Sequence, residues 1–494
     1  MKLFRQFKSI ISILFLSIII TCSIVVLCSC GNTNDKNGIA EKLTLITIND
    51  FHGALEESDG TNGIARLASN FKKEVDAADA SVIISAGDMF QGTALSNYDH
   101  GKTTIEIMNQ MNFDLMVLGN HEFDWGYSEM YNYQDGNENN GEAKFPFLGC
   151  NIIEKATGKL PEGLESYQII ERGGLKIGII GYMGYGNETD IAVTMIEDYY
   201  FAEPVAIISD LAKELRTKQE VDVVVVVGHE GNDSNDRLAA LSGDARVDAI
   251  VNAHTHASYS GTLTRSDGTK IPYVQAGSAG KKYGLIELNI NTETKQVTGG
   301  TAVTKNNSGT KDSSIEEIVN DLKDRTAPVF GRIIGVANSD VERYGAADWA
   351  ATALKDYAKT DVAVINIGGI RAQAFPIRMG ENITVSKMYE MMPFDNVLKT
   401  VDLKGEDLKA LITNGTLVTS ANVVLNYATG EIYINNEVLD LNRVYSVASI
   451  DYIFDNTSYP FFKGENKVNT GILFRDVLIQ RVEKDQTIQL VSRG

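Results

Sequence analysis

The sequence contains little cysteine, which limits how the fold can be stabilised. There are four cysteines in 494 residues, and Cys22, Cys28 and Cys30 all lie within the first 30. Cys150 is the one cysteine farther along the chain, so we expect no intrachain disulfide in the folded part. The core must then be stable through packing, and a hydrophobic content of 43% is sufficient for that.

The sequence also lacks runs of basic residues. Its formal net charge is −20, and no cluster of lysine or arginine interrupts the acidic background. Because such a chain repels a nucleic-acid backbone, we expect no nucleic-acid polymer as its partner. A small anionic substrate would need local positive charge, supplied by metal ions or by a few arginines.

The first 29 residues have the features of a secretion signal. Three basic residues, Lys2, Arg5 and Lys8, precede an apolar stretch over residues 10–27. The stretch ends in Leu-Cys-Ser-Cys-Gly, which resembles a bacterial lipobox and predicts lipid attachment at Cys30, with a polar tether over 30–40. The alternative is an uncleaved membrane helix, which would need no such ending. Both interpretations place the folded part outside the cytoplasm on a membrane anchor, and cleavage would change the charge from −20 to −23.

Alternating strand and helix patterns predict an α/β protein with two folding units. Strands are expected at 43–48, 82–85, 115–118, 177–180, 223–227, 249–252 and 362–365, and helices at 64–75, 104–111, 205–215, 346–358 and 473–483. We expect the first unit at 41–312, a linker helix at 313–330 and a smaller unit at 331–494. The Gly-rich segment 178–186 has the wrong spacing for a dinucleotide-binding loop, and it is interpreted as a turn.

Five of the six histidines lie just past the end of a predicted strand, together with acidic and amide residues. The segments are Asp50-x-His52, Gly87-Asp88, Asn120-His121-Glu122-Phe123-Asp124, Gly228-His229 and His254-x-His256. In an open α/β sheet, the loops at the carboxyl ends of the strands converge, so these side chains should meet there. The sixth histidine, His100, is interpreted as a solvated loop residue.

The residue types in these segments are those of a metal site. In each Asp-x-His or His-x-His pair, extended backbone would turn both side chains to one side. Carboxylate, amide and imidazole ligands without thiolate suit Mn²⁺, Zn²⁺ or Fe²⁺. The donors exceed what one ion needs, but two ions sharing a carboxylate, about 3.5–4 Å apart, could use them for a phosphoryl displacement.

With these motifs the chain resembles the calcineurin-like metallophosphoesterases, and in particular the bacterial and animal 5'-nucleotidases. Asn49-Asp50-Phe51-His52-Gly53, Gly87-Asp88-x-x-x-Gly92 and Asn120-His121-Glu122-Phe123-Asp124 carry the likeness in the first unit. In the second unit it depends on Asn366-x-Gly368-Gly369-Ile370-Arg371, Pro393-Phe394-x-Asn396 and Val468-Asn469-Thr470-Gly471. The resemblance implies an αββα sandwich, a linker helix and a smaller α/β domain that binds substrate.

The resemblance also implies a role for each matching residue. One ion would be held by Asp50, His52 and His256 and the other by Asn120, His229 and His254, with Asp88 bridging the two. His121 and Asp124 would form the catalytic pair. In the second domain, Arg371 would bind the phosphate and Asn366 the substrate beside it.

The chain departs from this family at the residues that would hold a nucleoside. Where relatives stack the base between two aromatic rings, Ser420 is expected at the first position, and Asp451 or Tyr452 at the second. The family's Gly-Gly-Asp-Gly segment, which binds ribose, is replaced by Asp455-Asn456-Thr457-Ser458. Arg343 is the nearest candidate for a second arginine ahead of the Asn-x-Gly-Gly-Ile-Arg motif.

The expected function is two-metal hydrolysis of phosphate esters outside the cytoplasm, with a nucleoside 5'-monophosphate as the favoured substrate. One alternative is a 2',3'-cyclic nucleotide phosphodiesterase or another phosphodiesterase. A second is a phosphatase for non-nucleoside phosphates, which the altered nucleoside site would favour. A third is a surface lipoprotein that binds without catalysis, although the complete ligand set and the His121–Asp124 pair argue against it. The metal identity and the oligomeric state are left open.

Overall fold

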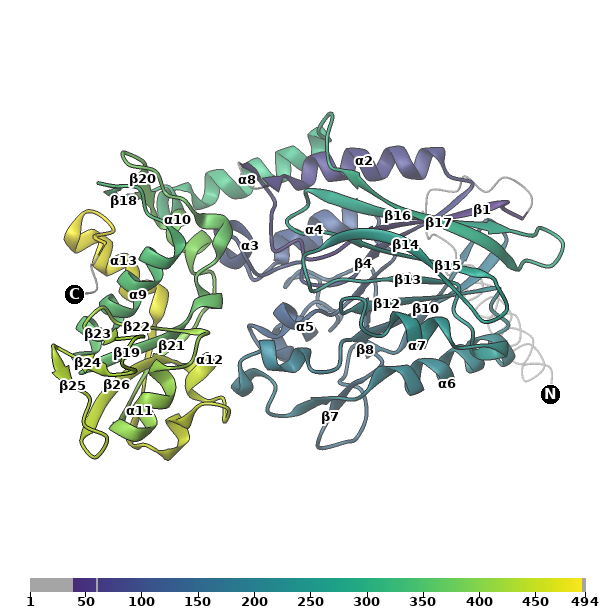
Figure 1. Cartoon of the computed structure of the whole chain (residues 1–494). Helices are drawn as coiled ribbons and strands as arrows, with labels where there is room; N and C mark the ends of the chain where they lie inside the picture. Colours follow the sequence, from purple (N-terminus) through teal and green to yellow (C-terminus); the bar gives the residue numbers. More distant parts are fainter. Residues whose placement is uncertain (1–38, 59–60, 491–494) are drawn as a thin grey trace, which may run out of the picture. The chain divides into compact units, whose positions relative to one another are not determined.

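Two β-sheets form the centre of the N-terminal region in the computed structural model, which describes residues 39–58 and 61–490 (Figure 1). The first sheet has the strands β17 (Val297–Asn306), β16 (Lys282–Ile290), β1 (Lys42–Ile48), β4 (Ala80–Ser85), β5 (Leu115–Val117), β6 (Phe147–Leu148) and β8 (Leu164–Glu165), in that order. The second has β14 (Ser258–Thr264), β15 (Lys270–Ala276), β13 (Ala249–Val251), β12 (Val223–His229), β10 (Leu175–Met183) and β9 (Tyr167–Arg172). The predicted signal and Cys30 lie outside the described residues.

The sheets are covered on both faces, which gives four layers. Residues such as Leu45, Ile84 and Val225 form a shared apolar layer between the sheets. On the outer face of the second sheet, Ile208 of α6 (Pro204–Thr217) packs in a cluster with Ile180. Helices α2 (Ile64–Ala77) and α4 (Lys102–Gln110) belong to the core on the outer face of the first. Burial of the strands on both faces explains their continuous apolar runs, and the predicted αββα fold is confirmed.

One local prediction was wrong, because the first part of the Gly-rich segment 178–186 continues strand β10 as far as Met183. The glycines provide room for neighbouring layers. A Cβ at Gly178 would lie 2.9 Å from Leu215 of α6, and one at Gly181 would lie 2.4 Å from Leu148 of β6. Both glycines therefore permit close packing inside a strand, where the sequence pattern had indicated a turn.

Helix α8 (Ser313–Phe330) connects the two regions of the chain. The residue before it, Asp312, caps its N-terminus, because the Asp312 side chain accepts hydrogen bonds from the backbone N–H groups of Ser314 and Ile315. This arrangement satisfies two amides that no helical carbonyl can reach. A helix at 313–330 was expected, while the domain limits set on either side of it stay a prediction.

The C-terminal region is built on a five-stranded sheet. Its strands are β22 (Leu417–Thr419), β19 (Val362–Asn366), β26 (Val444–Ile450), β21 (Val397–Lys404) and β27 (Glu465–Leu473), in that order. Its helices include α9 (Arg343–Ala358), α10 (Val385–Met391), α11 (Gly405–Ile412), α12 (Asp451–Phe454) and α13 (Phe474–Asp485). Asn366 is the last residue of β19, and Arg371 follows shortly after the 3₁₀ helix η5 (Ile367–Gly369), so this sheet positions two of the predicted substrate-binding residues.

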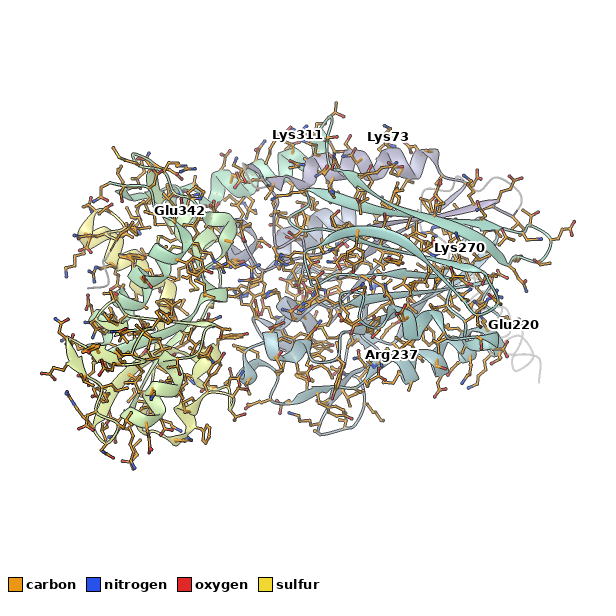
Figure 2. All side chains as sticks on the ribbon, in the orientation of Figure 1. Lys73, Glu220, Arg237, Lys270, Lys311 and Glu342 are labelled. Carbon is orange, nitrogen blue, oxygen red and sulfur yellow. The ribbon has the colours of Figure 1, made fainter. Side chains whose placement is uncertain are left out.

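The surface of the described chain is charged. Lys73 on α2, Glu220 after α6 and Arg237 on α7 (Asn235–Ala239) are all exposed (Figure 2). Within residues 39–58 and 61–490, we find no helix with the length and apolar character needed to cross a membrane.

Candidate metal and substrate site

The polar segments predicted at the strand ends come together at one edge of the two sheets. Asp50 and His52 follow β1, Asp88 follows β4, and Asn120 opens the short 3₁₀ helix η1 (Asn120–Phe123) after β5. From the second sheet, His229 is the last residue of β12, while His254 and His256 follow β13. Strands β1, β4 and β5 run parallel, as do β10, β12 and β13, which explains why their carboxyl ends share an edge.

The backbone at this edge differs from the extended geometry that we expected. Five of the candidate ligand residues have a left-handed conformation, with φ of 48° at Asp50, 52° at His52, 56° at Asp88, 71° at His254 and 58° at His256. Residues other than glycine adopt this region at a cost of about 1–3 kcal/mol each. The side chains therefore converge through sharp turns rather than through extended strand ends, and the surrounding packing must hold those turns.

Asp88 lies between two groups of metal-binding atoms. On one side, His52 Nε2 is 2.9 Å from His256 Nε2, and His256 Nε2 is 3.7 Å from Asp50 Oδ1. His52 Nε2 is also 3.9 Å from Asp88 Oδ2. These atoms lie within 4.8 Å of one another in groups of three, as expected of residues that could hold an ion.

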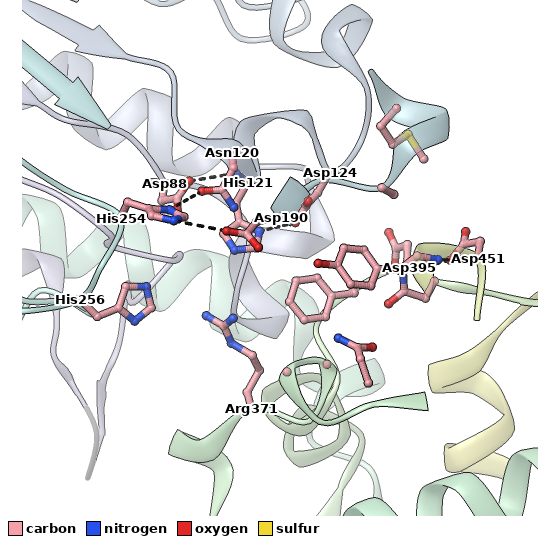
Figure 3. Close-up of a pocket in the computed structure, with 18 of the residues that line it drawn as sticks. Asp88, Asn120, His121, Asp124, Asp190, His254, His256, Arg371, Asp395 and Asp451 are labelled. Carbon is pink, nitrogen blue, oxygen red and sulfur yellow. Dashed lines mark hydrogen bonds and ion pairs between the residues drawn. The ribbon is translucent and has the colours of Figure 1, made fainter. Parts of the chain in front are cut away.

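The second group has Asn120 Oδ1 near its centre. That oxygen is 3.1 Å from His229 Nε2. It is also 3.0 Å from His254 Nδ1 (Figure 3). His229 Nε2 is in turn 3.2 Å from Asp88 Oδ2, so the same carboxylate reaches both groups. The arrangement matches the bridging position that the resemblance implied for Asp88.

Burial of the carboxylates fits a site for divalent cations. Asp50 is fully buried, and its burial, opposed by His229 and reinforced by Asp88, raises its pKa to about 6. Burial and the nearby Arg371 charge lower the pKa of His256 to about 4, although Asp88 opposes this shift. Asp50 is thus hard to ionise and His256 is hard to protonate, whereas the Asp88 and Asp50 carboxylates outweigh burial at His229 and raise its pKa to about 10. A bound cation would stabilise both ionised carboxylates and neutral imidazoles. The residues present therefore fit the metal ions that the motifs implied.

Glu122 holds the loops of this centre in place, a role that was not assigned from the sequence. Its fully buried carboxylate accepts hydrogen bonds from three backbone N–H groups. The N···O distances are 2.7 Å from Asp88, 2.8 Å from Met89 and 2.7 Å from Gly119. Burial and the neighbouring Asp88 charge raise its pKa to about 7. The loops after β4 and β5 are thus fastened to one side chain, and its position in the Asn-His-Glu motif was the available signal.

His121 and Asp124 form the pair that the sequence predicted. His121 Nδ1 lies 2.8 Å from Asp124 Oδ2, across one turn of backbone (Figure 3). Burial by itself would lower the pKa of His121, but the Asp124 and Asp88 carboxylates outweigh it and raise the pKa. Since Nδ1 faces Asp124, Nε2 is the ring nitrogen left for a ligand.

A cavity of about 400 Å³ opens beside the metal-binding groups, and both regions of the chain line it. The N-terminal region contributes Asp88, Asn120, His121, Asp124, Asp190, Ala192, Met195, His254, Thr255 and His256. The C-terminal region contributes Asn366, Gly368, Gly369, Arg371, Phe394, Asp395, Asn396, Asp451 and Tyr452. All three predicted substrate-binding residues, Asn366, Arg371 and Tyr452, therefore line one cavity with His121 and Asp124, the predicted catalytic pair.

Two of these residues are prepared for an anionic or polar ligand. Arg371 lies over the Phe394 ring at 5.5 Å from its centroid. Oδ1 of Asn366 is buried and has no hydrogen-bond partner among the described residues. Arg343 donates to the backbone carbonyls of Ile370 at 2.7 Å and Ile367 at 2.9 Å, so it supports this loop instead of lining the cavity.

The cavity also corrects the prediction for the first aromatic ring. Ser420 is fully buried in the C-terminal sheet, where its hydroxyl accepts the N–H of Ala363 at 3.1 Å. The ring that lines the cavity with Tyr452 is Phe394, which stacks on His121 at 5.7 Å between centroids. Phe394 belongs to the Pro393-Phe394-x-Asn396 motif, so the sequence did contain this ring, but the ring position was assigned to Ser420 in the core instead.

Two further expectations have different outcomes. Asp451 lines the cavity as Tyr452 does, so the choice between them is not exclusive, while Thr457 is exposed and is not among the lining residues.

His100 is in a loop as expected, but it is not simply solvated. Its Nδ1 lies 2.9 Å from Glu129 Oε1, and its ring stacks on Trp125 at 4.7 Å.

The four-layer sandwich and its edge of Asp, Asn and His side chains define the class as a metallophosphoesterase. Residues 43–258 match the family of calcineurin-like phosphoesterases, and residues 297–464 match the 5'-nucleotidase C-terminal domain. The chain therefore belongs to the calcineurin-like phosphoesterases that carry a 5'-nucleotidase C-terminal domain. The matched family is the phosphoesterase class that the motifs predicted.

Three curated relatives are 27–28% identical to this chain over the regions that align. Endonuclease YhcR of Bacillus subtilis is 28% identical over 75% of the chain and 32% of its own length. Cell wall protein Lmo0130 of Listeria monocytogenes is 27% identical over 85% of the chain and 62% of its own length. The 5'-nucleotidase of Rattus norvegicus is 27% identical over 74% of the chain and 70% of its own length. The chain thus spans about a third of the first relative and less than two thirds of the second.

A solved structure has the same fold. The 5'-nucleotidase precursor from Thermus thermophilus superposes with a TM-score of 0.76 at 23% sequence identity, covering 91% of this chain and 98% of that one. At that identity, the likeness supports the two-domain α/β architecture.

Proposed function

We propose that this protein hydrolyses phosphate monoesters with two divalent ions, and that nucleoside 5'-monophosphates are its substrates. The observation that carries the proposal is the single cavity that joins the metal-binding groups to Arg371 and to two aromatic rings, Phe394 and Tyr452. One ion would be held by Asp50, His52 and His256, and the other by Asn120, His229 and His254, with Asp88 shared. Ligands of this kind accept Mn²⁺, Zn²⁺ or Fe²⁺.

The groups around the cavity would have different roles in the reaction. Bound ions would neutralise charge on the phosphate oxygens and lower the pKa of the attacking water. Arg371 binds the phosphate as a fixed cation. The side-chain oxygen of Asn366, Oδ1, accepts a hydrogen bond from the part of the substrate beside the phosphate. His121 donates a proton or hydrogen bond from Nε2 as negative charge develops on the departing oxygen, while Asp124 orients the ring and favours its charged form.

The leaving-group half of the cavity suits a nucleoside. Phe394 and Tyr452 offer apolar faces on which a base can stack, a contact worth about 1–3 kcal/mol. Beside them, Asp451 Oδ1 is 3.0 Å from Asn396 Nδ2, and Asp395 pairs with the Arg475 guanidinium. These carboxylates can accept ribose hydroxyls in place of the absent family aspartate, and they disfavour a leaving group that carries a second phosphate.

The experiment is substrate hydrolysis by residues 31–494 with added Mn²⁺ or Zn²⁺, followed by phosphate release for the monoesters and by chromatography of the products for UDP-glucose and 2',3'-cyclic AMP. The substrates are AMP, UDP-glucose, 2',3'-cyclic AMP and p-nitrophenyl phosphate, and His121→Ala is the matched inactive variant. We expect AMP to be turned over fastest and the His121→Ala rate to be lower by a factor of about 10²–10⁴, as general acid catalysis predicts. Turnover of p-nitrophenyl phosphate without AMP would contradict the nucleoside assignment.

A phosphodiesterase activity is the second candidate. It is supported by the 28% identity to an endonuclease and by Thr457, an exposed residue where the family's ribose-binding aspartate would lie. The charge of −20 argues against long nucleic acids, so the diesters would be small. Faster turnover of 2',3'-cyclic AMP than of AMP in the same experiment would favour this candidate.

We further propose that the protein acts outside the cytoplasm, attached to the membrane by lipid at Cys30. The support is the lipobox-like sequence at 27–31 and the similarity to a relative named as a cell wall protein. Cys30→Ala should release the protein from the membrane fraction of expressing cells. Retention of that variant in the membrane would favour the uncleaved helix.

A further inference from the structure

Two histidines of the metal-binding groups are oriented by backbone carbonyl oxygens beside their outer ring nitrogens. His52 Nδ1 lies 3.1 Å from the carbonyl oxygen of Gln91, and His229 Nδ1 lies 2.8 Å from that of Ala86. Both rings therefore turn Nε2 toward the cluster, and rigid backbone fixes them.

His254 is oriented in the opposite way. Its Nδ1 faces the cluster, 3.0 Å from Asn120 Oδ1, while its Nε2 lies 3.3 Å from Asp190 Oδ2 (Figure 3). The acceptor is thus a charged side chain and not a backbone carbonyl. Because Asp190 is about half exposed, with 51% of its side chain accessible, solvent can compete for this contact.

Asp190 ends the 3₁₀ helix η2 (Asn187–Asp190), which contacts both halves of the cavity. Asn187 Nδ2 donates to the carbonyl oxygen of His229 at 2.8 Å, which fastens the segment to a metal-binding residue. The carbonyl oxygen of Thr189 accepts a hydrogen bond from the Tyr452 hydroxyl at 3.3 Å. The segment that presents Asp190 to His254 is therefore also in contact with a ring of the substrate half.

We infer that Asp190 is a positioning residue that prepares His254 to bind an ion through Nδ1. An imidazole that binds through Nδ1 carries its proton on Nε2, and a carboxylate that accepts a hydrogen bond from this N–H fixes both the tautomer and the ring angle. Loss of such a partner typically lowers metal affinity 10–100-fold. This inference depends on the proposed metal-dependent function, since it assigns Asp190 a role toward one of the two ions.

The test is the affinity of the purified chain for Zn²⁺, measured by competition with a chromophoric chelator. Asp190→Ala should weaken one of two binding events 10–100-fold, while Asp190→Asn, which keeps an acceptor oxygen, should lose less. Asp210→Ala is the matched control, since Asp210 lies on α6 with 82% of its side chain accessible. The melting temperature of the metal-free protein should be the same in all four proteins, because exposed ion pairs contribute little to stability.

The outcomes separate this inference from the proposed function. If the wild-type chain binds no Zn²⁺, the proposed function itself is contradicted. If the wild-type chain binds two ions and Asp190→Ala binds them with unchanged affinity, only the positioning role of Asp190 is overturned. An equal loss of affinity in Asp210→Ala would overturn it as well.

Discussion

Arg371 is, among the side chains that line the cavity, the cation placed to bind a phosphate group. Its guanidinium lies over the Phe394 ring, and its backbone N–H donates to the Met391 carbonyl at 2.9 Å. The side chain is therefore held at the cavity by contacts on both its backbone and its charged end. An arginine held in this way can bind phosphate without first being ordered.

Replacing Arg371 with alanine should raise KM for phosphate monoesters. Hydrogen bonds to a charged group contribute about 1.5–3 kcal/mol, which corresponds to an increase of roughly 10–150-fold. Steady-state kinetics with AMP and with p-nitrophenyl phosphate measure the effect. Arg378→Ala is the control, because Arg378 forms an exposed ion pair with Asp340 in the same region. An unchanged KM in Arg371→Ala would mean that this arginine does not contact the substrate.

Phe394 should distinguish nucleotides from other phosphate esters. Phe394→Ala removes a stacking face. Because base stacking on an aromatic ring contributes about 1–3 kcal/mol, kcat/KM for AMP should fall roughly 5–150-fold. A substrate without a nucleobase, such as β-glycerophosphate, should be affected much less. Phe462→Ala serves as control, since 55% of Phe462 is exposed. Equal losses for the two substrates would show that Phe394 supports His121 rather than a base.

At the scale of elements, the sequence predicted most strands and helices that position the site. Strand β12 was expected at 223–227 and occurs at Val223–His229, and helix α8 was expected at 313–330 and occurs at Ser313–Phe330. Such segments are predictable because an apolar run or an amphipathic period depends on neighbours in the sequence.

The predictions that were wrong concern features that depend on contacts between distant segments of the chain. The glycines of β10 fit beside Leu148 and Leu215, which no local pattern reveals. The left-handed turns at Asp50 and His254 and the placement of Phe394 likewise depend on tertiary packing. The residues of the candidate metal site could be predicted from motifs. The presence of Phe394 beside Tyr452 in the cavity could be seen only in the folded structure.

Gly181 should be intolerant of a side chain. A Cβ there would lie 2.4 Å from Leu148 and 2.8 Å from Val117, between the two sheets. Gly181→Ala should therefore lower the free energy of unfolding by about 1–3 kcal/mol, as overpacking does elsewhere. Urea unfolding measures this, with Gly415→Ala as control, because a Cβ at Gly415 meets nothing within 4 Å. Equal stability of the two variants would show that the sheets can separate locally.

At the scale of the whole molecule, metal binding and stability should be linked. The cluster combines buried carboxylates with five left-handed residues, and a ligand that binds only the folded state stabilises it. At a free metal concentration of 1,000 times Kd, one ion contributes about 4.1 kcal/mol. Chelation followed by thermal unfolding should therefore lower the melting temperature, and added Zn²⁺ or Mn²⁺ should restore it. A melting temperature that does not change with chelator would contradict this linkage.

If Asp88 bridges two ions, the number of metal ions bound per chain should depend on its carboxylate. Elemental analysis of the wild-type chain and of Asp88→Asn, after dialysis against a defined metal concentration, gives ions per chain. We expect two ions in the wild type, and fewer than two in Asp88→Asn with a parallel loss of phosphate release. Two ions and full activity in Asp88→Asn would contradict the bridging position of Asp88.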